Sequence, residues 1–74
     1  MKNKTVVTIR NQPYNVVTTE GKTVLQASKE CIAVLDTFDE DDSAVAHHNY
    51  WVNKLTNEQP LFVRDKITNK DILL

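Results

Sequence analysis

The densest group of reactive side chains is an acidic segment in the middle of the chain. Asp36 and Asp39–Asp42 supply five of the ten acidic residues. A Ca²⁺ loop needs spaced oxygen ligands, a glycine at its sharp turn and a terminal bidentate glutamate, and this segment lacks both the glycine and the final glutamate. Acidic side chains at a helix N-terminus accept from its free amides and complement its dipole. We therefore expect a helix-capping loop without metal or cofactor, whose surplus charge faces a basic partner.

Two adjacent histidines and one cysteine are the other groups with catalytic potential. On a helix, His47 and His48 would point about 100° apart, so they would not share one metal ion. Cys31 could act as a nucleophile with a histidine as its base. It falls, however, on the apolar face of a predicted helix, where a cysteine behaves as a small hydrophobe. We expect Cys31 in the core, both histidines at the surface or its boundary, and His47 in contact with a partner.

A short match to a phosphate-binding loop is incomplete. Glu20-Gly21-Lys22-Thr23 contains the Gly-Lys-Thr that ends such loops. The full motif needs a second glycine five positions earlier, where this chain has Val16. The sequence predicts a turn that leads into a helix, with no nucleotide cofactor.

Two β-rich segments begin the chain. Thr5–Arg10 and Tyr14–Thr19 are predicted strands, joined by Asn11-Gln12-Pro13. Alternation places Thr5, Val7 and Ile9 on one face of the first strand. Because proline lacks an N–H, Pro13 suits the connection better than a strand interior. We expect an N-terminal β-hairpin covered on one side by a helix.

The stretch Thr23–Phe38 has a helical period. Thr23-Val24-Leu25-Gln26 matches a capping box. An apolar face then recurs at helical spacing through Val24, Ser28, Cys31, Leu35 and Phe38, and Lys29 lies on the opposite side. This pattern predicts an amphipathic helix.

The second half of the chain allows two arrangements. Ala44-Val45-Ala46 after an acidic start favours a second helix from about Ser43 to Leu55. The competing interpretation is a strand at Asn49–Leu55, because Tyr50, Trp51 and Val52 favour strands, paired with Leu61–Ile67. Pro60 ends either element, and Leu61-Phe62-Val63 predicts a short strand. Thr68–Asp71 could cap one last helical turn that ends in Ile72-Leu73-Leu74.

The expected fold is therefore one small α+β domain over residues 1–74. It contains an N-terminal hairpin, an amphipathic helix, a second helix and a short C-terminal strand. This order of hairpin, helix and strand is similar to the opening of β-grasp folds, including ferredoxins and sulfur-carrier proteins. The residues behind those functions are missing, because one cysteine cannot hold an iron–sulfur cluster and the chain ends in Leu73-Leu74 instead of Gly-Gly.

Composition restricts the class of protein. Hydrophobic residues at 41% and charged residues at 26% are ordinary globular values. No signal-peptide or membrane-spanning apolar run is present, so the expected location is the cytoplasm, without membrane contact. Frequent asparagine and lysine with scarce glycine and proline suit an AT-rich microbial or phage genome.

We expect a non-enzymatic protein-interaction module: a small regulator or inhibitor, with a phage-encoded inhibitor as one form of the hypothesis. Aromatic side chains beside charge are typical of interface anchors. The expected partner is a protein with a basic groove, and a homo-oligomer is compatible with the small size. Trp51 is equally suited to closing the core. The expected partner-binding residues are Asp39, Glu40, Asp41, Asp42, His47, Tyr50 and Trp51.

The alternative function is a nucleic-acid-binding regulator that uses the basic N-terminal hairpin. Residues 1–35 carry a net charge of +3, from Lys2, Lys4, Arg10, Lys22 and Lys29 against two acids. Phosphate neutralisation drives such binding, and its usual charge bias is stronger than this. Direct nucleic-acid binding is therefore the second hypothesis.

Overall fold

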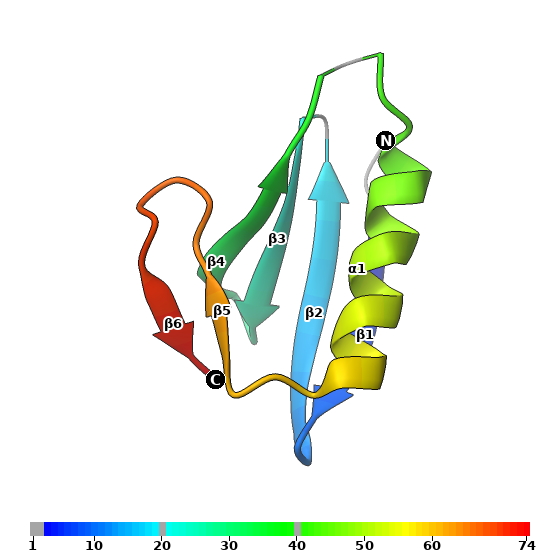
Figure 1. Ribbon diagram of the computed structural model, residues 1–74. Helices are drawn as coiled ribbons and strands as arrows, with labels where there is room; N and C mark the ends of the chain where they lie inside the picture. Colours follow the sequence, from blue (N-terminus) through cyan, green and yellow to red (C-terminus); the bar gives the residue numbers. More distant parts are fainter. Residues whose placement is uncertain (1–2, 20, 40) are drawn as a thin grey trace.

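The described part of the chain contains four consecutive strands, one helix and a short C-terminal hairpin (Figure 1). The computed structural model describes residues 3–19, 21–39 and 41–74. The predicted α+β class is confirmed, with one helix instead of two. The elements are β1 (Asn3–Ile9), β2 (Gln12–Thr19), β3 (Lys22–Ala27), β4 (Glu30–Thr37), α1 (Ala44–Glu58), β5 (Phe62–Arg64) and β6 (Asp71–Leu73). β1 to β4 form an antiparallel sheet in chain order, and β5 pairs with β6.

The predicted N-terminal hairpin is confirmed, but its turn is tighter than expected. Ile9 pairs with Gln12, so the turn contains only Arg10 and Asn11, whose φ angles are 49° and 70°. Positive φ at both central residues defines the type I′ turn that matches strand twist. Pro13 lies inside β2 opposite Thr8, beyond the last residue that pairs with β3.

The helix predicted over Thr23–Phe38 is wrong. The chain forms β3 and β4 there, joined by a turn at Ser28, whose φ is 56°. Thr23 caps no helix, and its hydroxyl is 3.0 Å from that of Thr18 on β2. The order is four strands and then a helix, so the likeness to β-grasp folds does not hold.

Two features explain this error. The segment is rich in β-branched residues, whose restricted side chains favour strands: Thr23, Val24, Ile32, Val34 and Thr37. The register between β3 and β4 also shifts twice, at Thr23/Val24 and at Leu25/Gln26. Each shift breaks the alternation by which a strand is recognised, and the remaining apolar spacing then matches a helix.

The helix of the second half is confirmed, and the competing strand at Asn49–Leu55 is excluded. α1 spans Ala44–Glu58, and the Ser43 side chain accepts from the Ala46 amide at 3.2 Å. Gln59 ends the helix in the left-handed conformation, with φ 47° and ψ 57°. Ser43 therefore supplies the cap, and the acidic residues precede it.

The C-terminal segment contains the predicted strand, but no final helical turn. Phe62 pairs with Leu73, and Arg64 pairs with Asp71. Asp65 organises the turn between them, because its carboxylate accepts from the Ile67 and Thr68 amides at 2.8 and 3.0 Å. These hydrogen bonds, with that of Thr68 the largest cause, lower the pKa of Asp65.

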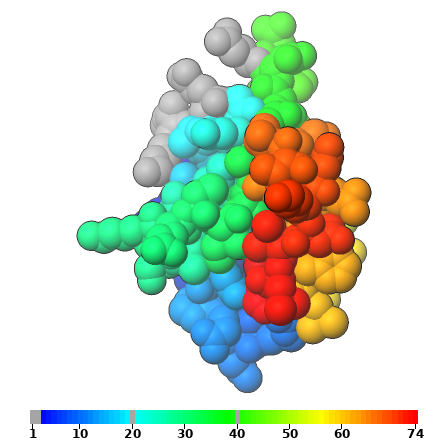
Figure 2. All heavy atoms as spheres, turned by 90° about the vertical axis from the view of Figure 1, so that its left-hand side faces the viewer, coloured from blue at the N-terminus to red at the C-terminus, as the bar shows by residue number. Residues whose placement is uncertain are grey.

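One core lies between the sheet and α1. β1, β2 and β3 contact the helix, and Figure 1 shows α1 running along β1 and β2. The C-terminal hairpin lies beside β4 (Figures 1 and 2), where the Lys66 amide donates to the Val34 carbonyl at 2.8 Å. The most buried core side chains are Ile9, Val16, Leu25, Ala33 and Leu55.

Candidate functional site

A cleft of about 620 Å³ lies between α1 and the C-terminal hairpin. Buried side chains of β4, α1 and β5 contribute to its lining: Leu35, Leu55 and Val63. Tyr50 on α1 and Phe62 on β5 also line the cleft, and each keeps more than half of its surface exposed. Charged side chains of both signs also line the cleft. Exposed aromatic rings around a concave site with apolar and polar groups are typical of a site that takes a partner's side chain.

Tyr50 and Trp51 form an aromatic corner in this cleft. Their ring centroids are 5.3 Å apart and their planes are perpendicular. The Lys54 ammonium lies 5.7 Å from the Tyr50 centroid and 5.9 Å from the Trp51 centroid. Both distances are within the range of a cation–π contact. The corner therefore holds a cation from its own helix.

Glu58 fixes that cation. Its carboxylate is 3.6 Å from the Lys54 ammonium, one helical turn further along. The carboxylate, followed by Tyr50, raises the pKa of Lys54. Tyr50, Lys54 and Glu58 are spaced four residues apart, so they share one face of α1.

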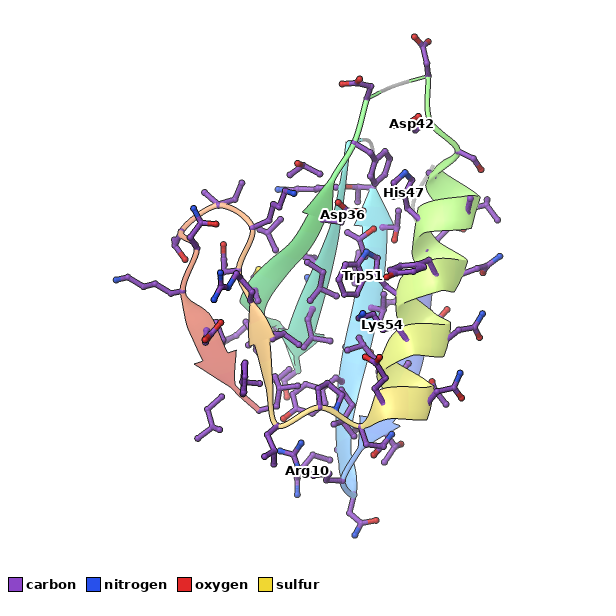
Figure 3. The ribbon with its side chains drawn as sticks, in the orientation of Figure 1. Arg10, Asp36, Asp42, His47, Trp51 and Lys54 are labelled. Carbon is purple, nitrogen blue, oxygen red and sulfur yellow. The ribbon has the colours of Figure 1, made fainter. Side chains whose placement is uncertain are left out.

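Asp36 connects the aromatic corner with the first turn of α1. Its Oδ2 accepts from the Trp51 indole N–H at 3.4 Å and is 2.8 Å from His47 Nδ1. The imidazole of His47 stacks on Phe38, with centroids 4.2 Å apart, and its Nε2 is 4.0 Å from Asp42. Figure 3 shows His47, Trp51 and Lys54 following one another along the side of α1 that faces β4.

His48 points into the core, and its expected position at the surface is wrong. It is only 6% exposed. Its Nε2 is 2.7 Å from the Thr5 hydroxyl, and its Nδ1 is 2.8 Å from the Thr18 hydroxyl. The Thr18 hydroxyl also contacts that of Thr23. Because a hydroxyl both donates and accepts, this chain satisfies a neutral imidazole in either tautomer.

The environment of His48 opposes its protonation. Burial lowers the pKa of its imidazole, because the charged form loses hydration. Its two hydrogen-bond partners are neutral hydroxyls. The arrangement is therefore structural: it holds the first half of α1 on the sheet.

The predicted partner-binding residues fall into two groups. Tyr50 and Trp51 line the cleft. His47 lies about one turn earlier on α1, and its Nε2 is 4.0 Å from Asp42. Asp39 and Asp41 lie in the loop between β4 and α1, and Glu40 is outside the described residues. Among the residues that the structure describes, Asp36 and Asp42 are the members of this acidic segment whose carboxylates lie within 4.0 Å of a His47 ring nitrogen.

Sequence reasoning missed Lys54 and Glu58 as parts of the site. Lys54 follows Tyr50 by four residues and Glu58 follows Lys54 by four, which was a usable signal once residues 44–58 were accepted as a helix. Sequence reasoning also placed Cys31 wrongly, in the core. This cysteine is exposed on β4, because the predicted helix face on which it was placed does not exist.

The basic hairpin has a structural role at its turn. The Arg10 guanidinium donates to the Pro60 carbonyl and, at 2.9 Å, to the Leu74 carbonyl. These bonds tie the β1–β2 turn to the C-terminal segment. In the described part of the chain, no cluster of three or more His, Cys, Asp or Glu side chains is arranged to hold a metal ion.

No helix within the described residues has the length and apolarity needed to cross a membrane. Comparison with protein-family models, curated proteins and solved structures finds no match to this chain. The functional interpretation therefore depends on the cleft and on the side chains around it.

Proposed function

We propose that the protein is a non-enzymatic interaction module, a small regulator or inhibitor, that docks a basic protein partner in the cleft between α1 and β5. The observation that carries this proposal is the pair of exposed aromatic side chains, Tyr50 on α1 and Phe62 on β5, that line a cleft of mixed apolar and charged character. Exposed aromatics around a concave site are typical anchors of protein interfaces.

The acidic segment supports a partner of basic character. Asp36 lines the cleft together with basic side chains of the C-terminal hairpin, and Asp42 lies in the loop that precedes α1, 4.0 Å from His47 Nε2. The carboxylates of Asp39 and Asp41 add to the negative charge of that loop and are exposed. Such a charged border steers an oppositely charged partner and contributes more to association than to residence time.

Affinity capture with defined variants tests the proposal. The immobilised protein is exposed to lysate of the native host, with and without nuclease treatment, and captured proteins are compared between wild type and Tyr50→Ala. We expect Tyr50→Ala to lose the specifically captured protein, because an interface anchor contributes about 2 kcal/mol or more.

Val6→Ala is the matched control. Val6 is 63% exposed and lies on β1, on the sheet face opposite to that of the buried Val7. Its replacement should leave capture unchanged. Equal loss in both variants, or capture that persists in Tyr50→Ala, would contradict the docking site. Capture that disappears on nuclease treatment would favour the alternative of a nucleic-acid-binding regulator.

A further inference from the structure

We propose that the aromatic corner of Tyr50 and Trp51 is a recognition site for a cationic side chain, and that an arginine of the partner displaces the Lys54 ammonium from it. This inference rests on the proposed function, because it names the group that the cleft would receive. Lys54 is then a placeholder that occupies the corner in the free protein.

The geometry of the corner supports this assignment. The two rings are perpendicular, with centroids 5.3 Å apart. A cation is attracted to the face of each ring by its quadrupole. The Lys54 ammonium lies within 6 Å of both centroids, so the corner accommodates a cation in the structure itself.

Nearby carboxylates complete the site. Glu58 is 3.6 Å from the ammonium on one side, and Asp36 accepts from the Trp51 indole on the other. Both line the same cleft. A guanidinium can stack on an aromatic face while its N–H groups pair with a carboxylate, which an ammonium does less well. The site chemistry therefore favours arginine over lysine.

Lys54 is suited to leaving the corner. Its side chain is 38% exposed, and that of Glu58 is 58% exposed, so water can solvate both when they separate. An exposed pair of this kind with four-residue spacing contributes little to stability. Displacement by a better cation therefore requires no rearrangement of the core.

The test uses the one tryptophan of the chain as its reporter. N-acetyl-arginine amide is titrated into wild type and into Lys54→Met, and Trp51 fluorescence and its indole N–H resonance are followed. Methionine keeps the length of the stem and removes the competing ammonium. We expect Lys54→Met to bind the probe about two- to fivefold more tightly, the range of an exposed cation–π contact.

Three controls make the result specific. Lys70→Met removes an exposed lysine outside the lining of the cleft and should leave probe binding unchanged. Glu58→Gln introduced into Lys54→Met should reverse the gain. The uncharged probe N-acetyl-methionine amide should show no gain in Lys54→Met. A gain for the uncharged probe, or no gain for the arginine probe in folded Lys54→Met, would overturn the proposal.

The outcomes separate this inference from the proposed function. If Tyr50→Ala loses the captured partner while Lys54→Met gains nothing for arginine, the docking cleft stands and the cation site is wrong. If the arginine probe binds as expected while capture is insensitive to Tyr50→Ala, the cation site stands and the docking role is wrong.

Discussion

The side-chain amide of Gln59 pairs with the backbone of Arg10 as a neighbouring strand would. Its Oε1 accepts from the Arg10 amide at 2.6 Å, and its Nε2 donates to the Thr8 carbonyl at 2.9 Å. One residue therefore ends α1 and covers part of the outer edge of β1. Covered edges reduce strand-to-strand aggregation.

Replacement of Gln59 should destabilise the fold. Gln59→Ala removes the hydrogen bonds to Arg10 and Thr8 and leaves a residue with positive φ at the helix end. We expect a loss of about 1–3 kcal/mol in the free energy of unfolding, measured in urea. Asn57→Ala, at an exposed position of α1, should change it by less than about 0.5 kcal/mol. Equal effects of the two changes would contradict the role of Gln59.

His48 should make stability depend on pH. Its pKa in the folded protein is below the ordinary value of 6.5, so the unfolded chain binds a proton more readily. Its contribution to stability is therefore complete above pH 6.5 and is lost as the pH falls below that value. Urea melts across this range should show a loss in wild type that is smaller in His48→Gln. A parallel pH dependence in both proteins would exclude this role.

The hydroxyl of Thr18 should stabilise the folded protein through its hydrogen bonds, in addition to the packing of the side chain. Thr18→Val keeps the shape of the side chain but leaves His48 Nδ1 and the Thr23 hydroxyl each without one partner. The expected loss is about 1–3 kcal/mol in urea melts. Thr8→Val, at an exposed position of β1, is the control and should have little effect. A neutral Thr18→Val would show that the buried chain of hydroxyls contributes nothing.

Leu35 should be a core residue, although the helix on which it was placed does not exist. It is 5% exposed and belongs to the core cluster. Leu35→Ala should cost about 2–4 kcal/mol, because it leaves a cavity. Lys29→Ala, in the exposed β3–β4 turn, should cost little. Small and equal shifts in urea would contradict the core that the sheet and helix form.

The local sequence pattern predicted the secondary structure correctly for β1 and α1, where the spacing of apolar residues matches the face that is buried. Thr5, Val7 and Ile9 were predicted to share a face of the first strand, and Val7 and Ile9 are buried. Ser43 and the apolar positions after it indicated α1. The segment Thr23–Phe38 misled because its two register shifts remove strand alternation. A helical period within this segment also does not reveal that β3 pairs with β2.

The candidate site could be predicted only in part, because some of its contacts join segments that lie apart in the sequence. Tyr50, Trp51 and His47 were predicted because aromatic and titratable residues beside charge are visible in one segment. The contact of Asp36 with both His47 and Trp51 joins β4 to α1, and it depends on β4 being a strand. His48 was placed at the surface because nothing local shows that Thr5, Thr18 and Thr23 surround it.

Binding kinetics of the captured partner test the central claim most directly. Association and dissociation rates are measured at low and high salt for wild type, for Tyr50→Ala and for the double change Asp39→Asn, Asp41→Asn. We expect the double change to slow association mainly at low salt, because steering acts through an unscreened field, while Tyr50→Ala speeds dissociation. Unchanged rates in both variants, together with loss of binding when the exposed Lys4 and Lys22 are replaced by glutamate, would contradict the cleft and favour the basic hairpin.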